Sequence, residues 1–80
     1  MQAKVYITLK PGILDPQGKA IQSSLRTLGF ADVGAVRLGK YLEVSLSETD
    51  PAKARLELEG MCKKLLANTV IEDYRFELVT

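Results

Sequence analysis

The sequence predicts an α+β domain of the ferredoxin-like βαββαβ type, with two helices on one face of an antiparallel sheet. Three observations predict this fold. Apolar residues alternate near both ends of the chain, which is typical of half-buried strands. Two internal segments carry apolar residues at helical spacing. Each of these segments starts at an Asp-Pro pair, as in a duplicated unit, and we expect a single domain spanning residues 1–80.

The first strand is expected over residues 3–9, where apolar side chains occupy every second position. The first helix follows Asp15, which we expect to cap it. Pro16 suits the first helical position because no amide hydrogen bond is lost there. The apolar face of this helix has the spacing i, i+4 and i+7, and consists of Ile21, Leu25 and Leu28. Gly29 can adopt the left-handed backbone that ends a helix.

The middle of the chain predicts two further strands joined by a tight turn. Gly39-Lys40 is typical of a two-residue hairpin turn. Apolar residues alternate on both sides of it, at Val36, Leu38, Leu42, Val44 and Leu46. These two strands would complete a four-stranded sheet.

The second helix is expected to begin like the first, with Asp50 as its cap and Pro51 in its first turn. Its apolar stripe consists of Ala54, Leu58, Met61 and Leu65, with Cys62 at the edge. Asn68 can end it in the left-handed conformation. The last strand is expected over residues 70–79, with Tyr74, Phe76 and Leu78 on one face.

Composition excludes several classes of function. The net charge is +1, from 11 basic and 10 acidic residues, so the basic excess of a nucleic-acid binder is absent. The chain has no histidine, which removes Ser–His and Cys–His nucleophile pairs and the commonest metal ligand. A single cysteine and the lack of a long apolar run lead us to expect a cytoplasmic protein that binds no membrane. So small a domain buries little surface, so we expect a homodimer or a larger oligomer.

The stretch KPGILDPQGKAI, residues 10–21, has the residue types of a phosphate-binding loop. A Walker-type loop has four residues between its glycines and a hydroxyl after its lysine. Here five residues separate Gly12 from the Gly18-Lys19 pair, and alanine replaces the hydroxyl residue. A carboxylate at Asp15 would accept the free amides and repel another anion. These features favour a helix cap, and a phosphate site stays the alternative.

The sheet face away from the helices is expected to be solvated, to form a dimer interface or to bind RNA. Tyr6 and Tyr41 would lie on it, as aromatics do in an RNA-recognition motif. Glu43 stands where a stacking aromatic belongs, and the mixed charges better suit cross-strand pairs or a protein interface. An RNA-binding or regulatory small-molecule-binding module therefore remains the alternative function.

Three runs, LKPGILDPQGKAI, VGAVRLGKYLEV and LLANTVIEDY, together resemble the PurS family, the small subunit of bacterial phosphoribosylformylglycinamidine synthase. The resemblance covers essentially the whole chain. It implies a subunit without catalytic residues, which joins a large ATP-dependent synthetase chain (PurL-like) and a glutaminase chain (PurQ-like) in purine biosynthesis. It also implies that this chain binds no cofactor, because ATP and magnesium would belong to the synthetase chain. Whether the subunit lines an ammonia path or only holds the complex together stays open, as does the subunit ratio.

The candidate partner interface is inferred from loop residues before the first helix that capping does not explain. Two neighbouring apolar residues in the loop before the first helix cannot both tuck under it, so one is expected to face another chain. Arg37, Lys40 and Asn68 lie in the other blocks that carry the resemblance. The predicted interface comprises Ile13, Leu14, Asp15, Pro16, Gln17, Arg37, Lys40 and Asn68. Cys62 is expected to be an inert buried thiol.

Overall fold

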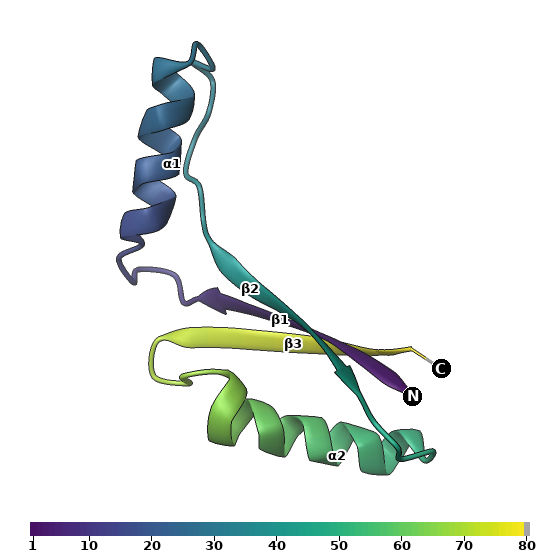
Figure 1. Ribbon diagram of the computed structural model, residues 1–80. Helices are drawn as coiled ribbons and strands as arrows, with labels where there is room; N and C mark the ends of the chain where they lie inside the picture. Colours follow the sequence, from purple (N-terminus) through teal and green to yellow (C-terminus); the bar gives the residue numbers. More distant parts are fainter. Residues whose placement is uncertain (80) are drawn as a thin grey trace.

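The computed structural model describes residues 1–79 and contains a three-stranded sheet, two α-helices and one short π-helix (Figure 1). In chain order the elements are β1 (Gln2–Leu9), α1 (Pro16–Thr27), β2 (Gly39–Ser45), α2 (Pro51–Met61), η1 (Cys62–Leu66) and β3 (Glu72–Val79). The molecule is elongated, with extents of 49 × 26 × 14 Å. The α+β class, the antiparallel sheet and the two helices are confirmed.

The sheet has the order β2-β1-β3, and β1 pairs antiparallel with both neighbours. The register places Val5 opposite Leu42 on one side and Phe76 on the other. Because side chains alternate along a strand, these apolar residues share the face that α2 covers. The alternation predicted for the first and last strands is therefore confirmed.

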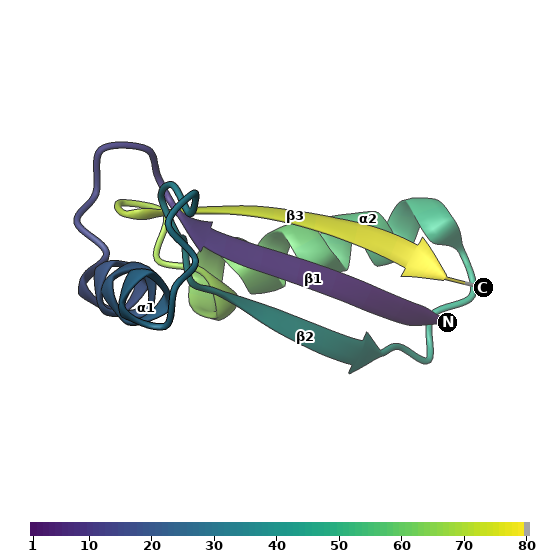
Figure 2. The ribbon, with the colours of Figure 1, turned by 90° about the horizontal axis from the view of Figure 1, so that it is seen from above.

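The core lies between this face of the sheet and α2. Its fully buried side chains are Ala3, Val5, Ile7, Ala54, Leu58 and Cys62. Figure 2 shows α2 behind β1 and β3, with β2 lying clear of the helix. For this reason Leu42 and Val44 on β2 are only partly buried. We call the sheet together with α2 and η1 the body.

Residues 10–38 form a second region, which we call the arm. They comprise the loop before α1, the helix itself and the segment that returns beside it. In Figure 1 the arm rises from one end of the sheet, and α1 covers no strand. Gly18 is the only buried residue of α1. Gly29 has φ of 105° directly after the helix, so its predicted left-handed role is confirmed.

The predicted hairpin at Gly39-Lys40 is wrong. These residues begin β2, opposite Thr8 and Ile7 of β1, so the sheet has three strands and not four. Residues 29–38 do not form a strand. They run back along α1, and Val36 lies against that helix at Gly18. An alternating apolar pattern fits an extended segment on a helix as well as it fits a strand.

The predicted placement of both helices on one face of the sheet also differs from the structure. Only α2 lies on the sheet, whereas α1 stands beyond its end (Figure 1). The carboxylate of Asp15 accepts a hydrogen bond from the backbone amide of Leu38, directly before β2. This contact connects the first turn of α1 to the start of β2.

The second helix ends differently from the prediction. Residues 62–66 form a π-turn, in which the amide of Ala67 donates to the carbonyl of Cys62 at 2.9 Å. A π-turn inserts one extra residue and rotates the following side chains. Leu66 therefore packs on the core, while Leu65, expected in the stripe, is 83% exposed.

Asn68 does not adopt the left-handed conformation expected of it, because no described non-glycine residue has a positive φ. Its side-chain oxygen accepts instead from the amide of Val70 at 3.2 Å, which turns the chain into β3. Among residues 1–79, no helix combines the length and apolar character needed to span a membrane.

Candidate functional site

The neck, where the arm meets the sheet, is organised by Asp15. One carboxylate oxygen accepts from the amide of Gly18 at 2.8 Å, which confirms the predicted helix cap. The other accepts from the amide of Leu38 at 2.9 Å. These two amides, with the positive charge of Arg37 as a smaller cause, hold the pKa of Asp15 below its usual value. A phosphate at this helix start would need the amides that Asp15 already occupies. Both carboxylate oxygens are engaged with them, so the structure favours the cap over a phosphate site.

The seam between α1 and the returning segment depends on Gly18. A Cβ atom at this position would lie 2.1 Å from the carbonyl oxygen of Val36, far inside van der Waals contact. Only a glycine lets the returning backbone approach the first turn so closely. Gly18 therefore allows α1 to pack closely against the returning segment and not against the sheet.

Arg37 closes the neck from the other side. Its guanidinium donates to the carbonyl oxygens of Leu9 and Lys10, at the end of β1. Lys10 in turn forms an ion pair with Asp73 on β3 at 3.0 Å. The neck is thus connected to all three strands at one end of the sheet.

Glu72 contacts two further residues of the predicted interface, Lys40 and Asn68. One carboxylate oxygen lies 3.8 Å from Nζ of Lys40, and the other accepts from the amide of Asn68 at 2.7 Å. A hollow of about 240 Å³ beside this cluster is lined by both arm and sheet, including Asp15, Gln17, Leu38, Lys40 and Glu72. The structure therefore places the predicted residues near one end of the sheet, where the arm begins.

Sequence reasoning missed Glu72 and Leu38, which complete this neck. Glu72 acts through Lys40, far away in sequence, and Leu38 contributes a backbone amide. Neither contact has a local sequence signal, because both depend on the pairing of β1 with β2 and β3.

The loop before α1 separates its two apolar residues, as predicted. Ile13 is half-buried, whereas Leu14 is 72% exposed. A second hollow of about 340 Å³ lies between this loop, α1 and the returning segment. Its lining combines apolar and charged residues: Gly12, Ile13, Leu14, Asp15, Lys19, Gln22, Ala35, Val36 and Arg37. Leu14 is thus the residue of the pair that is available to another chain.

Apolar side chains are exposed on both the arm and the sheet among the described residues. One group is the predicted apolar face of α1, where Ile21 and Leu28 are exposed, continued by Phe30. The other is the side of β2 that α2 does not reach, with Leu38 exposed and Leu42 half-buried. Exposed apolar surface of this kind typically marks an interaction site.

The outer face of the sheet carries an aromatic and cationic group. The rings of Tyr6 and Tyr41, paired across β1 and β2, have centroids 5.2 Å apart. The guanidinium of Arg75 lies 3.9 Å from the centroid of the Tyr6 ring. Arg75 therefore already occupies one face of the tyrosine on which a base would stack, and it also pairs with Glu77. Arg37 lies in the neck and not on this face.

Glu59 on α2 contributes to the raised pKa values of two groups in the body. Burial raises the pKa of the Cys62 thiol, with Glu59 as a further cause, so the reactive thiolate is disfavoured. A hydrogen bond of 2.6 Å to Glu59 raises the pKa of Tyr74 to about 12. Both groups stay protonated at neutral pH, and neither is suited to nucleophilic chemistry.

Comparison with known families identifies one match. Residues 2–80 match the PurS family, described as phosphoribosylformylglycinamidine (FGAM) synthase. A phosphoribosylformylglycinamidine synthase subunit PurS from Synechocystis sp. is 52% identical over 75 residues, which cover 94% of this chain and 75% of that protein.

Solved structures with the same fold include PurS from Methanocaldococcus jannaschii, described as one of the subunits of formylglycinamide ribonucleotide amidotransferase in the purine biosynthetic pathway. It has a TM-score of 0.85 and 45% identity, over 95% of this chain and 92% of that one. A chain in the structure of PurLQS from Thermotoga maritima has a TM-score of 0.84 and 27% identity, over 99% of both chains.

Proposed function

The chain belongs to the PurS family of phosphoribosylformylglycinamidine synthase subunits, and we propose that it is the small, non-catalytic subunit of that purine-biosynthetic complex. Its partners would be a PurL-like synthetase chain, which holds ATP, and a PurQ-like glutaminase chain. The observation that carries this proposal is the division of the fold into a body with a core and an arm whose apolar face is uncovered. We also propose a cytoplasmic location, which the single unpaired cysteine supports.

The absence of a catalytic role is supported by the residue inventory. The chain contains no histidine that could activate a nucleophile. Its only cysteine is fully buried, with a raised pKa. We therefore assign the release of ammonia and the ATP-dependent step to the partner chains, and to this chain the support of their assembly and of ammonia transfer between them.

The arm supports a homodimer. The radius of gyration is 16.1 Å, whereas a chain of this length that packs on itself has about 12 Å. The arm exposes apolar residues, and so does the uncovered side of β2. In a two-fold dimer the arm of one protomer would cover β2 of its partner, and each surface would be used twice. We propose this reciprocal arrangement.

The neck supports the contact with the larger chains. Leu14, Gln17 and Asn68 are exposed at this end of the sheet, and hydrogen bonds fix the backbone around them. A rigid exposed apolar residue within a polar rim is the usual form of an interface anchor. The eight predicted interface residues are proposed to contact a partner chain here.

Reconstitution tests the proposed function. The chain alone should show no glutaminase or ATPase activity, and its addition to the two larger chains should raise glutamine-dependent synthesis. Cys62→Ala should leave this stimulation within about twofold, because the thiol only fills space. No stimulation by the folded wild-type chain would contradict the assembly role, and complete loss in a folded Cys62→Ala variant would contradict the non-catalytic role.

Light scattering at micromolar concentration tests the dimer. We expect at least a dimer mass for the wild-type chain. A monomer mass at that concentration would exclude the reciprocal arrangement.

A further inference from the structure

Charge is distributed unevenly between the two regions. The arm carries four basic and two acidic residues, whereas the rest of the chain carries seven basic and eight acidic ones. One of the two arm acids, Asp15, is engaged with two backbone amides. The nearly neutral net charge therefore conceals a positively charged arm on a slightly negative body.

Three cations of the arm have no acidic partner among residues 1–79: Lys19, Arg26 and Arg37. The two arginines are nevertheless held in place, because they donate to neutral carbonyl groups. Arg26 donates to the carbonyl of Val33 at 3.0 Å and 3.2 Å, and Arg37 donates to backbone carbonyls of the neck. Their positions are fixed without a salt bridge among residues 1–79, although Asp15 lies near enough to Arg37 to feel its charge. Cations that are held in place by neutral carbonyl groups are preorganised for binding a carboxylate.

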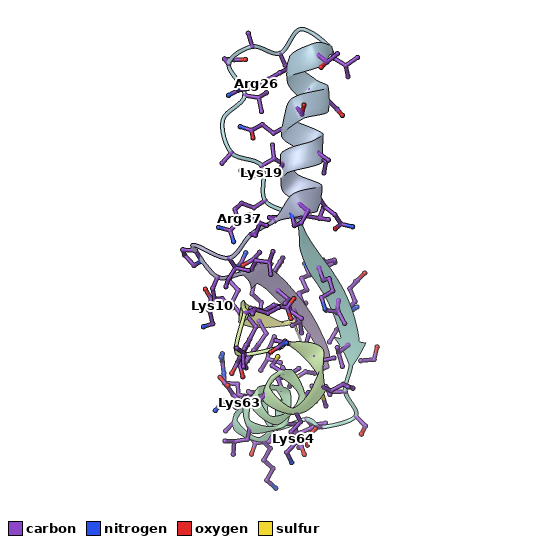
Figure 3. All side chains as sticks on the ribbon, turned by 90° about the vertical axis from the view of Figure 1, so that its left-hand side faces the viewer. Lys10, Lys19, Arg26, Arg37, Lys63 and Lys64 are labelled. Atoms are coloured by element: carbon purple, nitrogen blue, oxygen red, sulfur yellow. The ribbon has the colours of Figure 1, made fainter. Side chains whose placement is uncertain are left out.

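These cations lie along one side of the arm. Figure 3 shows Arg26, Lys19 and Arg37 following one another down the side where the returning segment lies, with Lys10 below them. Lys19 and Arg37 also line the hollow of about 340 Å³, beside the apolar side chain of Leu14. We call Lys19, Arg26 and Arg37 the basic stripe.

We propose that the basic stripe docks an acidic segment of one of the two larger chains of the complex, with an apolar side chain of that segment entering the adjoining hollow. This assignment rests on the proposed function, because it gives the partner contact a surface and a chemistry. It extends the predicted interface from the neck along the arm, and Lys19 and Arg26 are additions to that interface.

A second copy of this chain is not the expected occupant. Lys19 and Arg26 are seven residues apart and share one side of α1. Ile21, Leu25 and Leu28 form a different side at helical spacing. The proposed dimer covers that apolar side, and the basic stripe remains accessible to a third chain.

A nucleic acid is also not the expected occupant. Two of the three cations, Lys19 and Arg37, line a hollow whose wall also contains Ile13, Leu14 and Val36. This combination fits a peptide with both acidic and apolar side chains. The remainder of the chain has seven basic and eight acidic residues, so the basic excess that a long polyanion needs does not continue beyond the arm.

Charge reversal with a matched control tests this proposal. Lys19→Glu changes the stripe at an exposed residue that makes no side-chain hydrogen bond within residues 1–79. Lys63→Glu makes the same change of charge at an exposed position of the body, far from the arm (Figure 3). The dissociation constants of both variants and of the wild-type chain are measured against the purified synthetase and glutaminase chains, at low salt and at about 0.3 M salt.

Lys19→Glu should raise the dissociation constant for one of the two chains about three- to tenfold at low salt. The difference should shrink at the higher salt concentration, and Lys63→Glu should stay within about twofold of the wild type. Arg26→Gln, which removes a charge without reversing it, should have a smaller effect in the same direction.

Equal binding by Lys19→Glu and Lys63→Glu would overturn the basic stripe while leaving the proposed function intact. Failure of the wild-type chain to bind either larger chain would overturn the proposed function and this assignment with it. A single-stranded RNA probe of about 20 nucleotides provides the remaining comparison, and RNA binding by the wild-type chain that Lys19→Glu abolishes would overturn the choice of a protein partner.

Discussion

The two helices of this protein begin in the same way and end in different surroundings. Both start with an aspartate cap and a proline in the first turn, and they have 12 and 11 residues. The body helix α2 buries Ala54 and Leu58, and the chain continues into buried Cys62. The arm helix α1 buries only Gly18. Local signals therefore decide where each helix begins, and the path of the following segment decides what the helix covers.

The segments that follow the two helices lead to different parts of the molecule. After α2 the chain turns at Asn68 and enters β3, next to the strand that α2 covers. After α1 the chain runs back beside the helix itself and reaches β2 only at Gly39. The body thus contains its own hydrophobic core, while the apolar face of the arm is exposed in the single chain. The comparison predicts that mutations in the body affect folding and mutations in the arm affect assembly.

The largest expected effect is the loss of a core leucine. Leu58→Ala leaves a cavity in a fully buried site, so we expect the free energy of unfolding to fall by about 2–5 kcal/mol. Leu28→Ala is its counterpart on the arm, where the side chain is 73% exposed. It should change the stability of the monomer by less than about 0.5 kcal/mol but weaken the dimer. Urea unfolding over a range of protein concentrations measures both, and equal losses would contradict the division into body and arm.

A glycine pair tests the seam of the arm. Gly18→Ala places a Cβ atom against the carbonyl of Val36, and the resulting displacement should cost about 1–3 kcal/mol of local stability. Gly60→Ala on α2 has open space around it, and should stabilise that helix by about 0.5–1 kcal/mol because alanine favours helix. Amide hydrogen exchange should show faster exchange over residues 16–38 in Gly18→Ala alone. Unchanged exchange there would mean that the returning segment is held by other contacts.

The same comparison shows how far the sequence predicts this fold. Helix starts depend on neighbouring residues, so Asp15 and Asp50 were placed correctly as caps. The hairpin at Gly39 was wrong because the alternating residues before it lie against α1 instead of pairing in the sheet. The π-turn that exchanges Leu65 for Leu66 has no sequence pattern of its own. These failures all concern contacts between segments that are distant in the chain.

Part of the candidate site could be read from the sequence for a related reason. Capping explains Asp15 and Pro16, so one residue of the pair Ile13 and Leu14 was left without a structural role, and the structure shows that Leu14 is the exposed one. Glu72 was not identifiable, because its partner Lys40 becomes a neighbour only through the sheet. Family resemblance supplied the identity of the complex, which no contact within a single chain can supply.

Acid should loosen the arm before the body. The pKa of Asp15 is lowered in the folded state by two backbone hydrogen bonds. Its contribution is therefore complete above the unfolded pKa of about 4 and is lost as the pH falls through the lower folded value. Hydrogen exchange of the neck amides of Gly18 and Leu38 should accelerate, relative to the body, over that acidic range. Asp15→Asn should abolish this pH dependence, whereas Asp50→Asn should retain it, and a loss in both variants would mean that another group controls the neck.

The smallest expected effect on stability comes from replacing exposed leucines. The binding of these variants, in contrast, should differ clearly between the arm and the body. Leu14 in the arm is 72% exposed and Leu56 on α2 is 74% exposed. Leu14→Ser and Leu56→Ser should each change the free energy of unfolding by less than about 0.5 kcal/mol, because little surface is uncovered.

Their effects on binding to the synthetase chain should differ, because Leu14 lies between the capped neck and the hollow of the arm. An anchor residue at an interface contributes more than about 1 kcal/mol, so we expect Leu14→Ser to raise the dissociation constant about fivefold or more. Gln17→Ala should have a milder effect, as a polar contact at the rim, and Leu56→Ser should leave binding unchanged. Calorimetric titration of each variant against the synthetase chain measures these differences. Stronger loss from Leu56→Ser than from Leu14→Ser would transfer the partner contact from the arm to the outer side of α2, where Leu65 is also exposed.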